Sequence, residues 1–469
     1  MPQDYNRKTK IIATIGPASE KPDILEVLIK EGVDAARLNL SHDSHENHQR
    51  RIDLIRKFSK KYDRYVAIIC DLQGPKIRIG SLPADGVELV AGKKVVINAS
   101  VSKYEKKEIP LPSDIFAKGV KKGARVLLDD GMMEMKVLSV KGPRFNCVVY
   151  RGGKLLSNKG VNVPTLELRK SILEEKDRTD IDFAKKAGAD YIALSFLRTA
   201  KDVLDAKKLI KDTGIKLIAK IERPEAVHNL QEIIKAADGI MVARGDLGIE
   251  TPIWALPVKQ KEIIDITRNY TKPVIVATHM LDSMTRKSLP TRAEVSDVAN
   301  AVYDGADAVM LSSESASGSY PIESVKMMRS ILEETEKSLE YFKIKKMDKE
   351  LPITMSVARS ARYIAYDVGA KFIFAGTASG YSARAVSNFR PKQQIIGLTS
   401  NDVIARQLNI VWGVTPRVIR AKTVANLAPI AATKLFKKNK IKRGDRIVFI
   451  SGLKLGEIGQ TNNISVISF

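Results

Sequence analysis

Short apolar runs rich in branched side chains recur along the first two thirds of the chain, with helical spacing between them. Such runs are typical of strands that are covered on both faces of a parallel sheet. Most begin about 22 to 35 residues after the previous one, which is the spacing of strand–helix units. The pattern predicts strands at Lys10–Ile15, Ala35–Leu40, Tyr65–Leu72, Tyr191–Leu197, Lys216–Glu222, Gly239–Arg244, Pro273–Met280 and Ala308–Ser312. Eight such units predict an α/β protein with a closed (β/α)8 barrel.

One interval between these runs is too long for an ordinary loop. About 119 residues separate the third run from the fourth, and a connection of that length needs structure of its own. It alternates apolar and polar residues and is broken by Gly, Pro and Asp turns, as in ARVLLDDGMMEMKVLSV. We therefore predict a small β domain that is inserted after the third strand, over Lys76–Val163.

The last part of the chain alternates helix and strand patterns again. A charged helical stretch begins at Ser324, and residues 348–352 have the character of a linker. Beyond it the pattern predicts helices at Ser356–Asp367 and Ser382–Asn388 and strands at Lys371–Ala375, Gln394–Leu398, Asp445–Ile450 and Ile464–Ser468. We expect a separate α/β domain over 341–469, an inserted domain over 76–163, and a barrel made of 1–75 and 164–340.

Length and composition agree with a globular protein of about three domains, at roughly 150 residues each. The chain has 469 residues, of which 44% are hydrophobic and 28% are charged, which excludes collagen-like, disordered and disulfide-stapled classes. No apolar run approaches the length of a membrane span, and MPQDYNRKTK contains no apolar signal region. Cys70 and Cys147 have no metal-site spacing. We expect a cytoplasmic protein.

The charge balance favours anionic ligands. Lys and Arg number 78 against 54 Asp and Glu, a net charge of +24, which attracts nucleic acid, anionic lipid or phosphorylated metabolites. The densest basic run, Lys437–Arg443, contains no interleaved aromatic residue of the kind that a nucleic-acid platform uses. We therefore expect neither nucleic acid nor membrane as a partner and favour a phosphorylated small molecule.

Polar and charged residues follow most of the predicted barrel strands, where (β/α)8 enzymes place their active sites. By strand, they are Arg37, Asn39, Ser41 and His42; Asp71, Lys76 and Arg78; Lys220 and Glu222; Arg244 and Asp246; Thr278 and His279; Ser313 and Glu314. Residues two apart share a strand face, so Arg37, Asn39 and Ser41 point one way. The number of compatible groups favours a site, although a surface ion-pair network is an alternative interpretation.

The residue types indicate a particular chemistry. Glu222 and Asp246 follow adjacent strands, and paired carboxylates suit Mg²⁺ or Mn²⁺. Lys220 and the arginines suit a phosphoryl group that bridges to such a metal. GDLG at 245–248 predicts a turn that leads into a short helix, whose free N–H groups would bind a carboxylate or phosphate.

Other motifs are absent or ambiguous. No GxxxxGK[ST] loop and no GxGxxG occurs. His42, His45 and His48 have the spacing of a zinc site on a helix, but Ser44 is typical of an N-cap, which spreads them over a loop and a first turn. The segment Ala375–Ser382 joins a strand to a helix, and it is either a phosphate nest or an ordinary Gly/Ser turn.

These residues lie in stretches that resemble the pyruvate kinase family over essentially the whole chain. The stretches are TKIIATIGPAS, ARLNLSH, DLQGPKIR, KGVNVP, LIAKIERPEAV, DGIMVARGDLGIE, PVIVATHMLDSM, PTRAEVSDVANAVYDGADAVMLSSESA and YP. The resemblance implies a barrel with an inserted β-barrel lid and a C-terminal α/β regulatory domain. It implies the last step of glycolysis, transfer of phosphoryl from phosphoenolpyruvate to ADP with formation of pyruvate and ATP. A cytoplasmic homotetramer is the implied assembly.

The resemblance also implies roles for single residues. Glu222 and Asp246 would bind the divalent ion, and Lys220 would neutralise the phosphoryl in transfer. Arg37 and Arg78 would clamp phosphate, for which a planar guanidinium fork is suited. The expected substrate residues are Arg37, Lys220, Gly245, Asp246 and Thr278, of which Thr278 would also protonate the enolate. The expected nucleotide residues are Asn39, His42, Arg78 and Lys159, and closure of the inserted domain would exclude water.

A monovalent-cation pocket and an effector loop complete the implied sites. The pocket maps onto Asn39, Ser41, Asp71 and the Leu72 carbonyl. Lys76 stands where many members have glutamate, and its ammonium would supply the charge of K⁺, so we expect activity without K⁺. A loop for a phosphorylated effector maps onto Thr377, Ser379, Gly380 and Ser382. Departures from the family pattern are Ser313, Ser315 and His279. At the two serines we expect a local backbone adjustment only. His279 would either tune the proton transfer or fill space, and we favour the latter.

Two other functions fit parts of the sequence. One is a different (β/α)8 enzyme that acts on phosphoenolpyruvate or a related enolate, but the inserted domain and Lys159 argue against it. The other is a regulatory binding protein that kept the fold and lost catalysis. The presence of Lys220, Glu222 and Asp246 argues against that second possibility.

Overall fold

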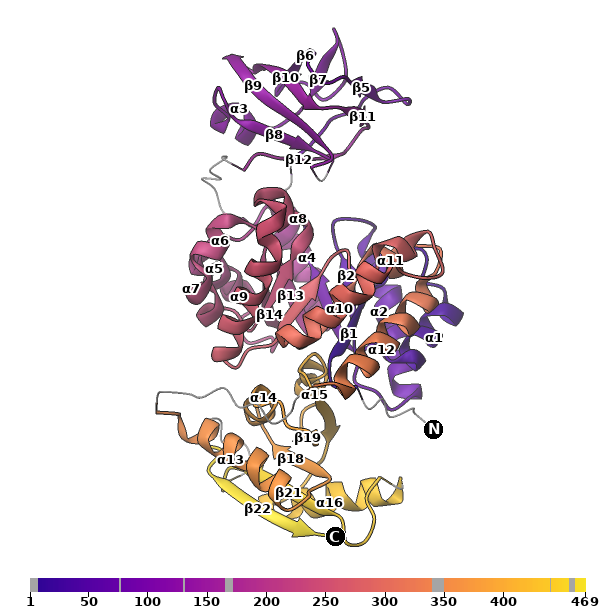
Figure 1. Cartoon of the computed structure of the whole chain (residues 1–469), viewed down its shortest axis with the longest axis vertical. Coiled ribbons are helices and arrows are strands. Elements are labelled where there is room, and N and C mark those ends of the chain that lie inside the picture. The colour runs from indigo at the N-terminus through magenta and orange to yellow at the C-terminus, as the bar shows by residue number, and fades with distance from the viewer. Residues whose placement is uncertain are drawn as a thin grey trace.

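The computed structural model describes residues 7–75, 77–129, 131–164, 172–339, 350–438, 440–454 and 460–469. Figure 1 shows three bodies in a row, with the inserted segment at one end of the barrel and the C-terminal segment at the other.

Eight parallel strands close into a barrel, which confirms the fold expected from the apolar runs. Around the barrel, which follows chain order, they are β1 (Lys10–Thr14), β2 (Ala35–Asn39), β3 (Ala67–Asp71), β13 (Tyr191–Leu194), β14 (Lys216–Ile221), β15 (Gly239–Ala243), β16 (Val274–Ala277) and β17 (Ala308–Leu311). Pairing of Ile12 with Ala35 and of Ala13 with Leu311 closes the ring. The strands are almost wholly buried because helices cover the outside and side chains fill the inside.

The barrel helices begin and end where the local sequence predicts. Ser44 Oγ accepts a hydrogen bond from the Asn47 N–H at the start of α2, as expected of an N-cap. Thr291 and Glu294 form a capping box on α10. The helices are α1 (Pro22–Glu31), α2 (His45–Lys61), α4 (Glu175–Lys186), α5 (Ala200–Leu209), α6 (Pro224–His228), α7 (Leu230–Ala236), α8 (Arg244–Glu250), α9 (Leu256–Asn269), α10 (Arg292–Asp304), α11 (Ser313–Ala316) and α12 (Pro321–Lys337), with 3-10 turns at Ile253–Ala255 and Asp282–Thr285.

The inserted segment is almost entirely β, as its alternating pattern predicts. A seven-stranded sheet has the order β4-β12-β8-β9-β10-β6-β7, and β11 pairs with β5. Its own core includes Phe116 and Phe145, whose rings meet edge to face with centroids 4.8 Å apart. The elements are β4 (Ile77–Arg78), β5 (Val87–Leu89), β6 (Lys94–Asn98), β7 (Glu108–Pro110), α3 (Asp114–Gly119), β8 (Arg125–Leu128), β9 (Met133–Lys141), β10 (Arg144–Arg151), β11 (Gly153–Leu155) and β12 (Gly160–Asn162). We call this body the inserted sheet.

The C-terminal body is a five-stranded sheet of order β20-β19-β18-β21-β22, with only β22 antiparallel to its neighbour. Its elements are α13 (Ile353–Asp367), β18 (Phe372–Gly376), α14 (Tyr381–Asn388), β19 (Gln394–Thr399), α15 (Asp402–Leu408), β20 (Val414–Val418), α16 (Val424–Lys437), β21 (Arg446–Ser451) and β22 (Asn463–Ser468). Arg406 Nε donates to Asp190 Oδ1 over 2.7 Å, and Tyr191 Oη donates to the Gln407 carbonyl over 2.8 Å. The N-terminal end of the barrel therefore rests on this body.

Within the described ranges, no helix is long and apolar enough to cross a membrane. The predicted charged stretch after Ser324 forms the rest of α12 up to Lys337. Of the predicted linker at 348–352, residues 348 and 349 lie outside the described residues.

Candidate active site

The polar residues at the strand ends lie directly above the apolar filling of the barrel. Ile218 belongs to the inner core, and Lys220 is the next residue on the same strand face. In the same way Arg37 follows Ala35, and Asp71 follows Ile69. The strands thus aim these side chains toward the barrel axis at its carboxyl end.

Lys220 is the centre of this group. Its Nζ lies 2.7 Å from Ser195 Oγ, 2.8 Å from Glu222 Oε1 and 3.2 Å from Asp71 Oδ1. Arg37 Nε donates to the other oxygen of Asp71 over 2.7 Å. We call Arg37, Asp71, Ser195, Lys220 and Glu222 the strand-end cluster. The structure therefore joins four residues that were expected separately from three strand ends.

Arg37 is held through two of its three guanidinium nitrogens. Nε is bonded to Asp71, and Nη1 donates to Thr14 Oγ1 over 3.1 Å. Nη2 makes no hydrogen bond with any described residue, and the Arg37 side chain is 13% exposed. Nη2 is consequently left to donate to an external oxyanion.

The electrostatic state of the cluster follows from burial and pairing. Burial lowers the pKa of Lys220, but Asp71 and Glu222 outweigh it and hold that pKa above its usual value. Burial raises the pKa of Asp71, but Lys220 and Arg37 outweigh it and hold that pKa below its usual value. Both groups are therefore ionised at neutral pH.

The cost of burying the Glu222 carboxylate is less completely offset by its neighbours. Burial raises its pKa to about 7, Lys220 opposes this rise, and the charge of Asp246 adds to it. Oε2 accepts from the Phe196 N–H over 2.8 Å. Oε1 is close to Lys220 Nζ, but the direction of that contact is not that of a hydrogen bond. An additional cation near Glu222 and Asp246 would stabilise both carboxylates.

The β16 end and α8 meet at a close contact. A Cβ atom on Gly245 would lie 2.9 Å from Thr278 Cγ2, so any larger residue there would displace the Thr278 side chain. Thr278 and His279 have φ of +73° and +53°, a left-handed conformation that non-glycine residues rarely adopt. The expected substrate residues Gly245, Asp246 and Thr278 are thus neighbours. GDLG differs from its expected form, since α8 already begins at Arg244 and the motif lies within the helix.

Ser195 escaped the sequence analysis, and Arg244 was placed at a strand end without a predicted partner. Ser195 accepts from Lys220 and donates to the Leu72 carbonyl over 2.7 Å. Arg244 fixes the β16 end, because Nη2 donates to the Thr278 carbonyl over 2.7 Å and Nη1 to Asp297 Oδ1 over 2.7 Å. Ser195 is the first polar residue after the β13 run, so the strand-end rule applied to that strand would have found it.

The remaining strand-end residues are structural in character. Both oxygens of buried Glu314 accept backbone hydrogen bonds, from Leu281 over 3.0 Å and from Ser312 over 2.8 Å. Buried Ser315 donates to the Thr14 carbonyl over 2.9 Å. These contacts tie the β17 end to its neighbours, and nothing in the structure assigns a role to Ser313 or His279.

The four expected nucleotide residues divide between two bodies. Asn39 and the exposed His42 belong to the barrel, where Asn39 Oδ1 accepts from the Ser41 N–H over 3.3 Å. Arg78 and Lys159 belong to the inserted sheet and are bonded within it, to the Asn158 carbonyl over 3.0 Å and to Asp129 over 2.8 Å. Within the described residues, neither of these two cations forms a hydrogen bond or ion pair with the barrel.

Of the expected monovalent-cation pocket, two members are already bonded. Asp71 binds Lys220 and Arg37 through its two oxygens, and the Leu72 carbonyl accepts from Ser195. Lys76 lies outside the described residues.

The histidines at the start of α2 point to different partners. His45 Nε2 lies 2.7 Å from Asp180 Oδ1, and its ring stacks on Phe183, whereas His48 Nε2 bonds the His42 carbonyl over 2.9 Å. Among the described residues, no group of three or more His, Cys, Asp or Glu side chains is placed to hold a metal ion.

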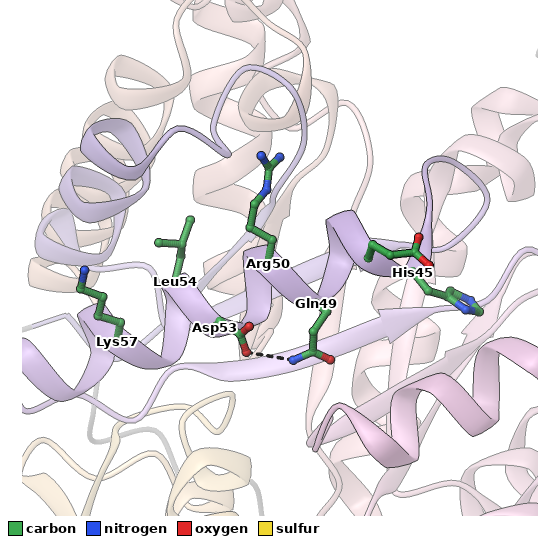
Figure 2. A pocket seen from close by; sticks show the side chains of 7 residues that line it. His45, Gln49, Arg50, Asp53, Leu54 and Lys57 are labelled. Carbon is green, nitrogen blue, oxygen red and sulfur yellow. Dashed lines mark hydrogen bonds between the residues drawn. The ribbon is translucent and has the colours of Figure 1, made fainter.

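A wide hollow of about 620 Å³ lies on the outer face of α2. Figure 2 shows its lining side chains on that single helix, with Gln49 Nε2 donating to Asp53 Oδ1 over 2.9 Å. The lining residues are His45, Glu46, Gln49, Arg50, Asp53, Leu54 and Lys57. None of them belongs to the strand-end cluster, so this hollow is not the candidate active site.

In the C-terminal body, the expected effector loop joins β18 to α14. Gly380 has φ of +83° and precedes α14. Buried Ser382 Oγ lies 2.6 Å from Thr461 Oγ1, and the Thr377 N–H donates to the Leu398 carbonyl over 2.9 Å. The loop is therefore anchored to the sheet at both ends.

Comparisons with known proteins agree with this geometry. The family model "Pyruvate kinase, barrel domain" matches residues 6–325, and "Pyruvate kinase, alpha/beta domain" matches residues 355–467. A pyruvate kinase of Geobacillus stearothermophilus is 43% identical over 471 residues, which cover 98% of this chain and 80% of that protein. One of Agrobacterium vitis is 42% identical, with 98% and 97% covered.

A solved structure gives the same result. The crystal structure of a pyruvate kinase from Cryptosporidium parvum superposes with a TM-score of 0.90 at 35% identity, covering 99% of this chain and 96% of that one. The two matching family models, the relatives at about 40% identity and the shared fold together show that the chain belongs to the pyruvate kinase family.

Proposed function

We propose that the protein transfers the phosphoryl group of phosphoenolpyruvate to ADP, giving pyruvate and ATP. The strand-end cluster carries this proposal, because it places a charged lysine beside an arginine whose Nη2 is unbonded among the described residues, at the carboxyl end of the barrel. Phosphoryl transfer requires such positioning and charge stabilisation rather than a covalent intermediate on the protein.

The residues present fit a divalent cation of the Mg²⁺ or Mn²⁺ type. Glu222 and Asp246 supply carboxylate oxygens, and buried Glu222 Oε1 pairs with Lys220 Nζ over 2.8 Å but completes no hydrogen bond among the described residues. Two protein carboxylates, completed by substrate oxygens and water, are the usual holding set for Mg²⁺. When bound, the ion would neutralise charge on the phosphoryl oxygens.

The chain's own cations would hold the phosphoryl group. Lys220 remains ionised because Asp71 and Glu222 flank it, so its charge is available to the phosphoryl in transfer. Arg37 offers Nη2 to a phosphate oxygen, and Arg78 on the inserted sheet would clamp the same group. Neither step requires a change in the protonation of the protein.

Gly245, Asp246 and Thr278 would bind and protonate the carbon end of the substrate. The N–H groups at the start of α8 suit the substrate carboxylate. Thr278 packs against Gly245 and would deliver a proton to the enolate, directly or through water. Arg244 holds the Thr278 carbonyl and thereby positions its side chain.

ADP would bind between the barrel and the inserted sheet. Asn39 and His42 lie on one side, and Arg78 and Lys159 lie on the other. Closure of the inserted sheet would bring the two sides together and exclude water. We further propose domain limits of 1–75 with 164–340, 76–163, and 341–469.

The monovalent cation, the effector and the assembly are further parts of this proposal. Asn39, Ser41, Asp71 and the Leu72 carbonyl would form the monovalent pocket, with Lys76 in place of K⁺. Thr377, Ser379, Gly380 and Ser382 would hold a phosphorylated effector. Ile253, Trp254 and Val258 are 70%, 81% and 66% exposed, and this apolar patch supports self-association into a homotetramer. We expect a cytoplasmic location.

The direct test is ADP-dependent formation of pyruvate from phosphoenolpyruvate with Mg²⁺, in K⁺ and in tetramethylammonium. Activity in both salts supports the whole proposal. Activity in K⁺ alone keeps the reaction and contradicts the role of Lys76. Absence of activity in both salts, with phosphorylated effectors added, contradicts the proposed function and favours a binding protein.

A further inference from the structure

The inserted sheet meets the barrel at the end of α8, as Figure 1 shows from the positions of β12 and α8. Asn162, the last residue of β12, donates from Nδ2 to Glu250 Oε1 over 3.1 Å. The two residues are 7% and 9% exposed. Glu250 ends the same short helix that carries Gly245 and Asp246 near its start. A buried hydrogen bond therefore joins the inserted sheet to a helix of the candidate site.

The second oxygen of Glu250 makes this contact more than ordinary packing. Oε2 is buried and has no hydrogen-bond partner among the described residues. Burial raises the pKa of Glu250, while Arg223 and the hydrogen bond from Asn162 oppose the rise. A partly satisfied buried carboxylate is costly to the fold, and such local costs are expected at functional positions.

The strand that ends at Asn162 also positions the two cations of the inserted sheet. Gly160 pairs with Arg78 and Val161 with Ile77, so β12 and β4 move as one unit. Lys159 immediately precedes β12. Any rotation of the inserted sheet about Asn162 therefore moves Arg78 and Lys159 together, relative to Asp246 on α8.

Gly131 lies near α8 at the same place. It precedes β9 in a turn and has φ of +80°, and a Cβ atom added there would lie 3.6 Å from the Ile249 side chain. Glycine has no Cβ atom, so Gly131 itself brings no side chain to this junction. The directional contact at this junction is the Asn162–Glu250 hydrogen bond.

We propose that Glu250 is a positioning residue whose hydrogen bond with Asn162 sets the angle of the inserted sheet, and with it the distance from Arg78 and Lys159 to Asp246. The claim about the angle stands on the contact itself, whereas its consequence for ADP rests on the proposed function.

The angle can be measured without substrates. Tyr150 on the inserted sheet and Leu204 on the barrel are 60% and 50% exposed, whereas Cys70 and Cys147 are buried. Spin labels at Tyr150→Cys and Leu204→Cys would report the distance between the two bodies by double electron–electron resonance. We expect Glu250→Ala and Asn162→Ala each to widen the distance distribution about twofold, and the double variant to widen it no further.

Glu225→Ala is the matched control, because Glu225 pairs with Arg223, whose charge also acts on Glu250, but makes no hydrogen bond with the described residues of the inserted sheet. Its distribution is expected to match that of the unaltered protein. Equal widths in Glu250→Ala, Asn162→Ala and the control would overturn the proposal. Asn162→Ala keeps the test decisive if Glu250→Ala fails to fold.

Kinetics separate positioning from stability. Glu250→Ala is expected to raise the KM for ADP about tenfold, the usual loss for a hydrogen bond to a charged group, with the KM for phosphoenolpyruvate within about twofold. Glu250→Gln should restore the KM for ADP, since its amide oxygen still accepts from Asn162. An unchanged KM for ADP in Glu250→Ala would overturn the proposal. An inactive unaltered protein would contradict the proposed function instead, and the distance measurement would still decide the positioning claim.

Discussion

One barrel strand holds two lysines in opposite electrostatic states. Lys216 begins β14 and Lys220 stands near its end, on the same inward face, with Ile218 of the inner core between them. The pKa of Lys220 is held above its usual value, because Asp71 and Glu222 outweigh the effect of burial. Burial lowers the pKa of Lys216 to about 7, aided by the charge of Arg384 and only weakly opposed by Asp238.

The difference shows that partners, and not burial alone, decide the charge of an enclosed lysine. At the same end of the barrel as Lys216, Lys8 and Lys10 donate to carbonyl oxygens of the C-terminal body. Burial lowers their pKa values to about 7 and about 8. Neutral carbonyls stabilise an ammonium less than a carboxylate does. One end of the barrel therefore keeps charge for a ligand, and the other uses lysines as domain contacts.

Removal of the charged lysine is the strongest way to test this contrast. Lys220→Met is expected to lower kcat for pyruvate formation by about 10³-fold or more, because a preorganised charge at the transferred group is lost. Lys216→Met, on the same strand, should keep kcat within about twofold. Steady-state kinetics on both variants, with circular dichroism to establish folding, make the comparison. Equal losses in the two variants would contradict it.

The next largest effect concerns the divalent ion. Glu222→Gln removes the charge of a proposed ligand from a buried site and is expected to weaken Mn²⁺ binding about 10- to 100-fold. Electron paramagnetic resonance of free Mn²⁺ measures this without any turnover. Glu225→Gln, three residues along the chain, is the control and should bind as the unaltered protein does. Unweakened binding by Glu222→Gln would place the metal elsewhere.

The inserted sheet contrasts with the buried cluster, since its cations are more exposed. Lys159→Met removes a side chain that is 38% exposed and, among the described residues, forms an ion pair only with Asp129. We expect the KM for ADP to rise about tenfold, while the free energy of unfolding changes by less than about 0.5 kcal/mol. Chemical denaturation beside ADP saturation curves gives both numbers. A large loss of stability would show that Lys159 is structural.

The smallest expected effect is on stability against pH. Because Lys216 has a lower pKa in the folded protein than in the unfolded chain, the unfolded state binds more protons between pH 7 and about pH 10. Its contribution to stability therefore rises with pH across that range. Lys216→Met should flatten the slope by at most about 1.4 kcal/mol per pH unit. Urea unfolding at pH 7, 8 and 9 checks this, and an unchanged slope would contradict the lowered pKa.

Much of the fold could be predicted because parallel barrel strands are buried on both faces and leave continuous apolar runs. All eight predicted runs became strands, with ends that differ by a few residues. The elements of the C-terminal body were predicted less completely from the sequence. Strand β20 has the sequence VTPRV, in which Pro416 and Arg417 interrupt the apolar pattern. The proline is tolerated because β20 lies at the sheet edge. Helix α16 was missed, and it contains Pro429 in its interior.

The candidate site was predictable in its residue types but not in its contacts. The strand-end rule located Arg37, Asp71, Lys220 and Glu222, since strand ends of a barrel meet at one place. It could not show that Ser195 bonds Lys220 or that Arg244 holds Thr278, because these contacts depend on side-chain directions after the strands end. The Asn162–Glu250 contact joins residues 88 positions apart and leaves no pattern in the sequence.

The most direct test of the contrast is the protonation of the two lysines on β14. Nuclear magnetic resonance of protein labelled with ¹³C at lysine Cε can follow each lysine through a pH titration. The Lys216→Met and Lys220→Met variants identify which signal belongs to which lysine. We predict that Lys216 titrates with a midpoint near pH 7 and that Lys220 stays protonated beyond the usual lysine range. Titration of both lysines together near their usual pKa, or of Lys220 below it, would contradict the account.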